Sequence, residues 1–386
     1  MSNHPVPSVN VQILDIRDPT TAITDESMRN EVIAGLTDST KKWPVMILYD
    51  ERGLQLYDAM TSYAPEYYLF AAETNILQRH ADEIVQAMRN HAANAESEGQ
   101  DLVELGSGAL RKTTYLLSAL ARQIPHTAPV PTNRFYALDL DKHELVRTLK
   151  ELESSPVGRE MEGKVSAVGL WGTYDDGTRF IAAGGLEDRS SGRDDHGSTA
   201  TTSNRPLHML FLGSTLGNFA RREDMAAFLK TLPLRPGSGD TLLLGMDQND
   251  DGEMIYTAYN ARMGLTRAFT MNGLVYAGRI LGNEDLFDVP NWEYVGRYVQ
   301  SLRRYEFYLE SRCEQTMTDP LTGIQYTFPP GHRIFANVAH KFSDADAHTL
   351  FEGADLRPIR RWTDEATKYA MWLLERPASA TPVVHD

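Results

Sequence analysis

Residues 101–108 read "DLVELGSG". A short run of strand character passes through Glu104 and ends in two glycines, Gly106 and Gly108. Glycine adopts positive φ readily and lets a ligand approach the backbone closely, so this segment is typical of a loop that binds a nucleotide-like ligand. Three ligands are candidates for such a loop: a dinucleotide, the phosphates of ATP, and a sulfonium cofactor.

The sequence around this segment alternates between strand and helix patterns. Apolar runs predict strands at 13–17, 101–106, 133–141, 164–172, 206–219 and 240–248. Helical spacing of apolar residues predicts helices at 26–37, 65–90, 109–122, 143–153 and 222–232. This alternation indicates an α/β fold with a doubly wound, Rossmann-like parallel sheet.

Composition and pattern divide the chain into five parts. We expect an N-terminal tail at 1–25, the α/β domain at 26–250, a smaller α+β module at 251–340, a return to the first sheet at 341–376, and a C-terminal tail at 377–386. The α+β module contains alternating runs that are typical of antiparallel strands, and we expect it to recognise the substrate. Residues 187–205 are rich in Ser, Thr, Gly and charged residues, so we predict a disordered, dispensable insertion there.

The composition also restricts the partners. The formal net charge is −15, which repels phosphate backbones and argues against nucleic acid. Cys313 is the single cysteine, which fits a reducing compartment and excludes a multi-cysteine zinc site. The sequence shows no clustered metal ligands, no secretory leader and no apolar run of about 18–20 residues. We therefore expect a cytoplasmic, metal-free monomer that acts on a small molecule and binds no membrane.

The residues themselves favour one of the three ligands. A dinucleotide loop needs a third glycine, but that position is Arg111, and no G-x-x-x-x-G-K-[ST] phosphate loop is present. S-adenosylmethionine carries no phosphate, and its ribose needs an acid at the end of the second strand, where Asp139 stands. The alternative that Gly106 and Gly108 only form a tight turn stays open on spacing alone.

Four motifs, in order, resemble one known family: "LYDERGLQLYDAMTSYAPEYYLFAAETNIL" (48–77), "LVELGSGALRKT" (102–113), "FLGSTLGNF" (211–219) and "TAYNARMGLTRAF" (257–269). They resemble the amino-acid α-N-methyltransferases, which include the histidine-specific enzyme of ergothioneine biosynthesis and the fungal 4-dimethylallyltryptophan N-methyltransferase. The similarity runs from about residue 27 to 376. It implies a class I methyltransferase fold, S-adenosylmethionine as cofactor, and a role in secondary metabolism such as alkaloid biosynthesis.

The resemblance implies a set of cofactor-binding residues: Tyr49, Gly106, Lys112, Asp139, Leu170 and Trp171. A lysine in the position of Lys112 can meet the cofactor carboxylate, and Asp139 matches the acid that binds the ribose. Leu170 and Trp171 stand where relatives place an acid and an aromatic residue against adenine. This chain has no acid at that position, and Trp171 is also compatible with a role in the hydrophobic core.

On the substrate side the resemblance implies three residues. Tyr67 would orient the amine and is the one residue to which we assign a catalytic role. Asn218 and Tyr259 would bind the α-carboxylate, for which amide and phenol donors are suitable chemistry. The alternative for Asn218 is a helix N-terminal turn. We assign no strong general base.

The side chain of the substrate is the open question. The histidine-specific pattern E-x-S-x-K-[FY] corresponds here to "NVAHKF" (337–342), with Asn337 in place of the acid and Ala339 in place of the serine. Phe307 stands where relatives have methionine. These changes favour an aromatic amino acid such as tryptophan or 4-dimethylallyltryptophan. Two alternatives remain: histidine as substrate, hydrogen-bonded by Asn337, and a catalytically silent accessory protein.

Overall fold

The computed structural model describes residues 11–20, 24–92, 99–125, 127, 131–186 and 205–378. The predicted insertion at 187–205 lies outside the described residues except for Arg205. Residues 13–15, within the expected N-terminal tail, form a strand that joins the central sheet beside the strand at 165–171.

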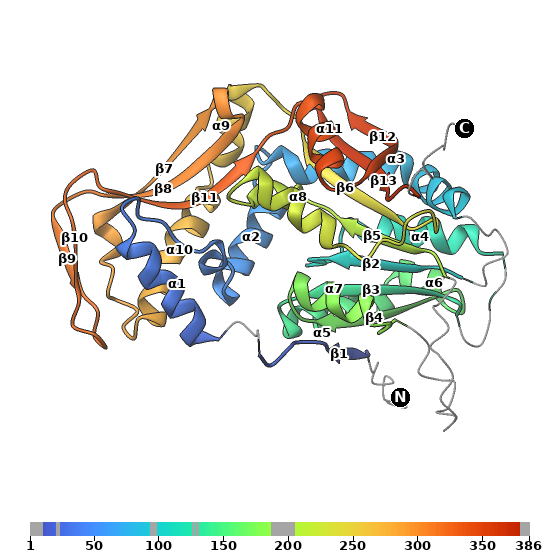
Figure 1. Ribbon diagram of the computed structural model, residues 1–386, viewed down its shortest axis with the longest axis horizontal. Coiled ribbons are helices and arrows are strands. Elements are labelled where there is room, and N and C mark those ends of the chain that lie inside the picture. Colours follow the sequence, from blue (N-terminus) through green and yellow to red (C-terminus); the bar gives the residue numbers. More distant parts are fainter. Residues whose placement is uncertain are drawn as a thin grey trace, which may run out of the picture.

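An eight-stranded sheet forms one half of the molecule (Figure 1). Its order is β1-β4-β3-β2-β5-β6-β13-β12. The strands are β1 (Ile13–Asp15), β2 (Asp101–Leu105), β3 (Asn133–Asp139), β4 (Val165–Trp171), β5 (Leu207–Phe211), β6 (Thr241–Asp247), β12 (Arg357–Asp364) and β13 (Tyr369–Glu375). The first six are parallel, whereas β13 and β12 are antiparallel to their neighbours. The predicted α/β sheet is confirmed, and the returning hairpin makes it a mixed sheet.

The interior strands are buried on both faces because helices cover both sides of the sheet. Every residue of β2, β5 and β6 is buried, which matches their nearly continuous apolar sequences. One face carries α3 (Tyr68–His91), α4 (Thr113–Gln123), α5 (Lys142–Ser154) and α6 (Pro156–Met161). The other carries α7 (Tyr174–Ala182), α8 (Arg222–Thr231) and α11 (Asp344–Gly353).

The strand order reverses at β2, which lies between β3 and β5. In open parallel sheets, ligands bind outside the carboxyl ends of the strands where the order reverses. The segment "LGSG" follows β2 at this edge, and Asp139 ends the neighbouring strand β3. The topology therefore brings the glycine loop and Asp139 to the same edge of the sheet.

The strand predicted over 206–219 ends early, at Phe211. Gly213 has φ of +73° and Ser214 has φ of +54°, and this left-handed pair breaks the extended backbone. The chain then forms a short 3₁₀ helix, η2 (Thr215–Asn218). The turn carries Asn218 away from the sheet and toward the second half of the molecule.

The second half contains antiparallel strands and helices (Figure 1). Its strands are β7 (Trp292–Val299), β8 (Arg304–Ser311), β11 (Arg333–His340) and the hairpin β9 (Gln315–Thr318) with β10 (Gln325–Phe328). Its helices are α1 (Asp25–Thr37), η1 (Val45–Leu48), α2 (Glu51–Tyr63), α9 (Gly252–Tyr259), α10 (Leu265–Ile280), η3 (Val289–Asn291) and η4 (Gln300–Leu302).

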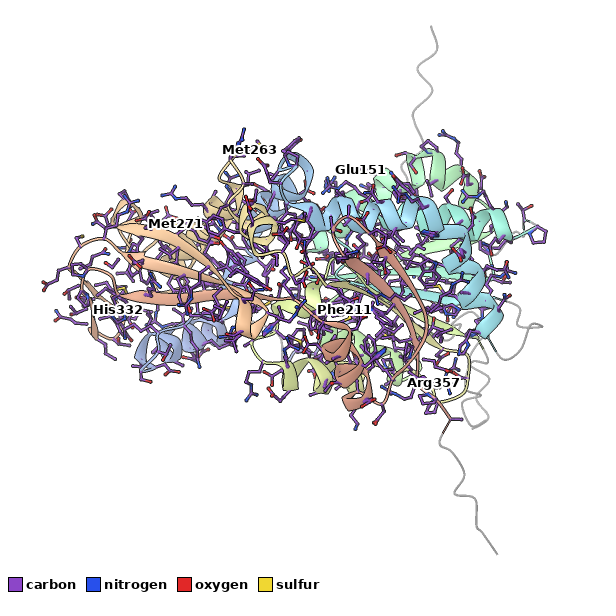
Figure 2. The ribbon with its side chains drawn as sticks, turned by 90° about the horizontal axis from the view of Figure 1, so that it is seen from above. Glu151, Phe211, Met263, Met271, His332 and Arg357 are labelled. Atoms are coloured by element: carbon purple, nitrogen blue, oxygen red, sulfur yellow. The ribbon has the colours of Figure 1, made fainter. Side chains whose placement is uncertain are left out.

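The helices near the N-terminus pack with this second half. Helix α10 contacts α1, α2 and η1, and the amide of Trp43 donates to the carbonyl of Phe335 at 2.9 Å. In Figure 2, Phe211 of the central sheet and Met271 of α10 lie in different parts of the elongated molecule. The domain boundaries at residues 250 and 340 stay a prediction.

Within the described ranges, no helix has both the length and the apolar content required to cross a membrane.

Candidate active site

The loop after β2, residues 106–110, is held in a turn that requires glycine. Gly106 has φ of +71° and Gly108 has φ of +48°. The amides of Gly106 and Ser107 both donate to the carbonyl of Leu138, at 2.9 and 3.0 Å. A Cβ atom on Gly106 would lie 2.7 Å from the hydroxyl of Tyr174, so a side chain there would displace that ring.

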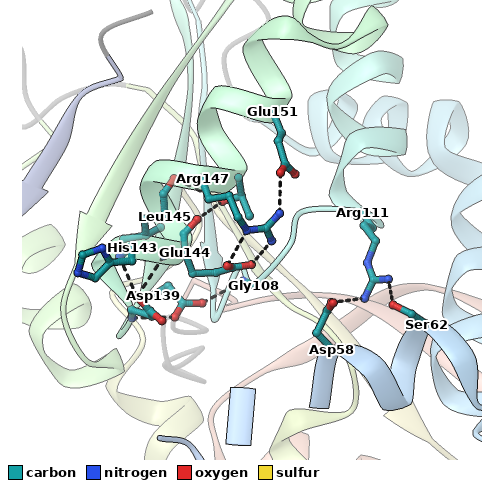
Figure 3. A network of polar contacts seen from close by, with 12 residues as sticks. Asp58, Ser62, Gly108, Arg111, Asp139, His143, Glu144, Leu145, Arg147 and Glu151 are labelled. Atoms are coloured by element: carbon teal, nitrogen blue, oxygen red, sulfur yellow. Dashed lines mark hydrogen bonds and ion pairs between the residues drawn. The ribbon is translucent and has the colours of Figure 1, made fainter. Parts of the chain in front are cut away.

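Asp139 faces this loop from the end of β3 (Figure 3). Its Oδ2 accepts a 2.9 Å hydrogen bond from the amide of Gly108, and its Oδ1 accepts a 3.1 Å bond from the amide of Asp141. Burial raises the pKa of the Asp139 carboxyl, and these two amides partly offset that rise. Each oxygen keeps a lone pair for a ligand hydroxyl, which suits a ribose.

Arg111, in the position of the missing third glycine, fastens the loop to helix α2. Its guanidinium donates to Asp58 at 2.6 Å and also bonds Ser62 (Figure 3). It donates to Thr61 as well, at 2.8 Å. The side chain that excludes a dinucleotide fingerprint therefore connects the cofactor loop to the second half of the molecule.

Lys112 forms an ion pair with Glu73, a residue that the sequence motifs did not single out. Glu73 is completely buried and also accepts bonds from the amide of Gly213 at 2.9 Å and the hydroxyl of Tyr369 at 2.7 Å. The pKa of Lys112 is raised because the attraction of Glu73 outweighs burial. Lys112 thus stays cationic at the edge between β2 and β5, where it can meet a carboxylate.

Glu104, the acid of "DLVELG", lies inside the sheet beneath this group. The hydroxyl of Thr113 is 2.7 Å from each of its carboxylate oxygens. Burial raises the pKa of Glu104 to about 8. At neutral pH this carboxyl is largely protonated, so it adds little negative charge below the loop.

These residues fit S-adenosylmethionine. Lys112 suits its carboxylate and Asp139 its ribose, and the Oγ atom of Ser107 is buried without a partner among the described residues. Leu170 is fully buried in the core. The indole of Trp171 donates to the carbonyl of Leu140 at 3.0 Å, and the guanidinium of Arg17 lies 3.2 Å from its ring centre. Contacts of Leu170 and Trp171 with adenine stay a prediction.

A cavity lies between the two halves of the chain, and we call it the aromatic pocket. It is lined by Tyr49, Tyr57, Met60, Tyr67, Leu69, Gly213, Ser214, Asn218, Tyr259, Thr266, Phe269, Phe307, Asn337, Ala339, His340 and Lys341. The residues predicted to bind substrate from five separate segments are therefore brought together. Tyr49, which we expected at the cofactor, lines the same pocket, and the amide of Asn218 lies 3.5 Å from its hydroxyl.

Tyr259 is at the centre of the aromatic side chains. Its ring centre lies 5.9 Å from that of Tyr67 and 5.1 Å from that of Phe307, both in edge-to-face geometry. The ring of Tyr305 lies 4.6 Å away on another side. This packing fixes the Tyr259 ring within the pocket wall, so its hydroxyl has a defined position.

The pocket also contains a buried cation that the sequence interpretation did not use. Lys341 is 1% exposed, and its ammonium lies 2.6 Å from the carboxylate of Asp247 and 2.7 Å from the hydroxyl of Tyr259. A signal for it was present in "NVAHKF". Because side chains alternate along a strand, Lys341 shares its face with Asn337 and Ala339.

The sequence pattern indicated less clearly that Glu73 belongs to the site. It precedes Ile76 and Leu77 by three and four positions, so it continues the buried stripe of α3. A charge on such a stripe requires a partner, but the sequence does not say which one. Across the described part of the chain, no cluster of three or more His, Cys, Asp or Glu side chains could hold a metal.

The fold and the glycine loop define a class I, S-adenosylmethionine-dependent methyltransferase. The model of the family described as "Histidine-specific methyltransferase, SAM-dependent" matches residues 28–376, and the chain belongs to this family. The resemblance drawn from the four sequence motifs is thereby confirmed. The protein is an S-adenosylmethionine-dependent N-methyltransferase of this amino-acid-modifying family.

Three relatives illustrate the range of the family. The chain is 35% identical to the "L-tryptophan methyltransferase trpM" of Psilocybe serbica, over 97% of this chain and 99% of the relative. It is 31% identical to the "Histidine N-alpha-methyltransferase" of Mycobacterium tuberculosis, over 90% and 94%. It is 27% identical to the "4-dimethylallyltryptophan N-methyltransferase easF" of Arthroderma benhamiae, over 94% and 97%.

Proposed function

We propose that this protein methylates the α-amine of an aromatic amino acid, either tryptophan or a 4-dimethylallyltryptophan-like derivative. The observation that carries the proposal is the pairing of Phe307 and Asn337. They lie directly opposite each other in the antiparallel pair of β8 and β11, and both line the aromatic pocket. The names of the relatives from Psilocybe serbica and Arthroderma benhamiae agree with it.

The chemistry of the pocket suits an indole. No Asp or Glu is among the described residues that line it. A carboxylate facing an indole ring would be poorly satisfied, at a cost of about 1–3 kcal/mol. Phe307 instead offers a ring to pack against, worth about 0.5–1.5 kcal/mol beyond the area buried. Ala339 adds space without a hydroxyl that requires a partner.

Different residues of the pocket bind different groups of the amino acid. Asn218 and Tyr259 donate to the α-carboxylate, and Tyr67 orients the amine. When bound, S-adenosylmethionine would supply an electrophilic methyl group: the amine nitrogen would gain the bond to the methyl carbon and release a proton to water, and the sulfur–methyl bond would break to give the neutral thioether. The amine must lose a proton before it attacks; the α-amine of a peptide has a pKa of about 7.7–8, that of a free amino acid is higher because of its own carboxylate, and we assign no strong general base to this step. The main contribution of the protein is positioning.

The proposal also covers the compartment, the oligomeric state and the partners of the protein. We propose a cytoplasmic monomer that uses no metal and no nucleic acid. The net charge of −15 disfavours binding to phosphate backbones, and the single cysteine fits a reducing compartment.

Histidine is the second candidate. The description of the family and the name of the Mycobacterium tuberculosis relative favour it. In that case the amide of Asn337 would hydrogen-bond the imidazole in place of a carboxylate.

The test is a methyl-transfer assay with purified protein, S-adenosylmethionine and each of the twenty amino acids plus indole-substituted tryptophans. Fragmentation in a mass spectrometer locates the methyl group. We expect α-N-methylated tryptophan or its derivative, and no product from N-acetyltryptophan, whose amine is blocked. If S-adenosylhomocysteine binds in calorimetry but no amino acid is methylated, the protein is an accessory one and the proposal is wrong.

A further inference from the structure

The buried ion pair of Asp247 and Lys341 is part of a chain of polar contacts that leads to the wall of the aromatic pocket. Asp247 is completely buried at the end of β6, and Lys341 follows the end of β11. From Asp247 the chain of contacts runs through the Lys341 ammonium at 2.6 Å to the hydroxyl of Tyr259 at 2.7 Å. Both Lys341 and Tyr259 line the pocket, so the positive end of the chain faces it.

Asp247 is well satisfied without a ligand. It accepts a 2.7 Å bond from the hydroxyl of Tyr68 and a 3.1 Å bond from the amide of Asn249. Lys341 uses two of its three N–H donors in its contacts with Asp247 and Tyr259. A buried ion pair gives little net stability compared with apolar packing, so its presence on a pocket wall suggests a role in binding.

The contact between Lys341 and Tyr259 determines whether the Tyr259 hydroxyl donates or accepts a hydrogen bond there. Lysine can only donate, so the Tyr259 oxygen is the acceptor. The hydrogen of that hydroxyl is therefore available to donate into the pocket. The neighbouring cation polarises the hydroxyl and makes it a better donor to an anion.

We propose that Lys341 is a positioning residue that makes the pocket select substrates with an α-carboxylate, acting through the hydroxyl of Tyr259. This inference rests on the proposed function and deepens it. An amine of the same shape that lacks the carboxylate leaves the Tyr259 hydroxyl without the anion to which it would donate, whereas the ammonium keeps its contact with Asp247. Sites built to bond a particular group reject analogues that lack it.

The experiment compares tryptophan with tryptamine. Because Lys341→Met alone would leave Asp247 buried and unpaired, the main variant is Lys341→Met with Asp247→Asn. The matched control is Lys230→Met with Asp355→Asn, which removes a lysine–aspartate pair on the surface, with the two side chains 58% and 59% exposed. Both variants are checked for folding by thermal unfolding before kinetics.

The main variant removes the cation that orients and polarises the Tyr259 hydroxyl, so we expect the KM for tryptophan to rise about 10- to 100-fold. We expect kcat to change less than about 3-fold, and kcat/KM for tryptamine likewise, so that selectivity for tryptophan falls at least about 10-fold. The control should keep the selectivity of the wild type. A folded main variant with unchanged selectivity would overturn the proposal.

Tyr259→Phe provides a second measurement, because it removes a single oxygen and keeps the ring packing. It should lower the selectivity to a similar degree, and adding the Lys341 and Asp247 changes should lower it no further. Fully additive effects would contradict action through Tyr259. If the wild type methylates histidine, the same comparison is made with histidine and histamine, so failure of the proposed substrate and failure of the Lys341 role are distinguishable.

Discussion

Phe307 on β8 and Asn337 on β11 are direct partners across an antiparallel strand pair, and both face the aromatic pocket. Side chains in such pairs lie about 4.5–5.5 Å apart at Cβ, so they contact the same part of a ligand. Two of the three positions at which this chain departs from its histidine-specific relatives therefore form one surface.

Restoring the histidine pattern should change the substrate preference. We expect Asn337→Glu with Ala339→Ser to raise kcat/KM for histidine and to lower it for the aromatic substrate, each by about 10-fold or more, because the new acid pairs with imidazole and is unsatisfied by indole. Steady-state kinetics with both amino acids provide the measurement. Thr266→Ser, a small change elsewhere in the pocket, is the control. A variant that keeps the wild-type preference would show that other residues determine which substrate side chain is accepted.

Asp139 should bind the cofactor directly. Asp139→Ala removes the acceptor of the Gly108 amide, and we expect binding of S-adenosylhomocysteine to weaken by about 1–3 kcal/mol in calorimetry. Asp141→Ala is the matched control. Asp141 caps α5 by accepting from the amides of His143 and Glu144, so its loss should cost about 1 kcal/mol of stability and leave affinity unchanged. Equal affinities for wild type and Asp139→Ala would remove Asp139 from the cofactor site.

Glu73 should be required to keep Lys112 in place. Glu73→Gln retains an oxygen for Tyr369 and Gly213 but leaves the ammonium unpaired, so we expect the free energy of unfolding in urea to fall by about 3 kcal/mol. Adding Lys112→Met should recover part of this stability but not the affinity for S-adenosylhomocysteine.

The control for Glu73 is Glu83→Gln on the same helix. Glu83 is 37% exposed and pairs with Arg360 at the surface, so its loss should cost less than about 1 kcal/mol. If Glu73→Gln proves no more costly than this control, the buried pair does not hold the loop together.

Glu104 should make stability depend on pH. Its pKa is raised from an ordinary value of 4.5 to about 8 by burial, so between these values the folded protein holds a proton that the unfolded chain releases. The stabilisation from the protonated form is complete below about pH 4.5 and is lost as the pH rises through about 8.

The measurement for Glu104 is urea unfolding at several pH values, with Glu104→Gln as the variant that cannot titrate. From pH 5 to 8 we expect the stability of the wild type, relative to this variant, to fall by on the order of 3 kcal/mol. Glu365→Gln, which changes an 84% exposed side chain, should track the wild type. Parallel curves for wild type and Glu104→Gln would show that Glu104 does not titrate in this range.

Local patterns predicted most of the central sheet. The strand ending at Gly106 and the acid at Asp139 follow from apolar runs and glycine chemistry, and their meeting at one edge follows from parallel topology. The end of β5 was mispredicted because apolar character continues past Phe211 to Leu212, although Gly213 was a signal for the left-handed turn that it forms with Ser214.

The partners within the site were harder to predict. Pairs such as Lys112 with Glu73, or Lys341 with Asp247, join residues that are 39 and 94 positions apart in the chain. Periodicity shows which face a residue occupies, but it does not show which distant element covers that face. The aromatic pocket was anticipated through resemblance to a family, and the charges beneath it became apparent in the structure.

The central claim is that the pocket is built for an aromatic side chain. It is tested most directly by kcat/KM of the wild-type protein for histidine, tryptophan and 4-dimethylallyltryptophan, measured side by side at saturating S-adenosylmethionine. The account predicts that one of the two indole substrates exceeds histidine by at least about 10-fold. A higher value for histidine would contradict it and would mean that Asn337 and Phe307 accommodate an imidazole.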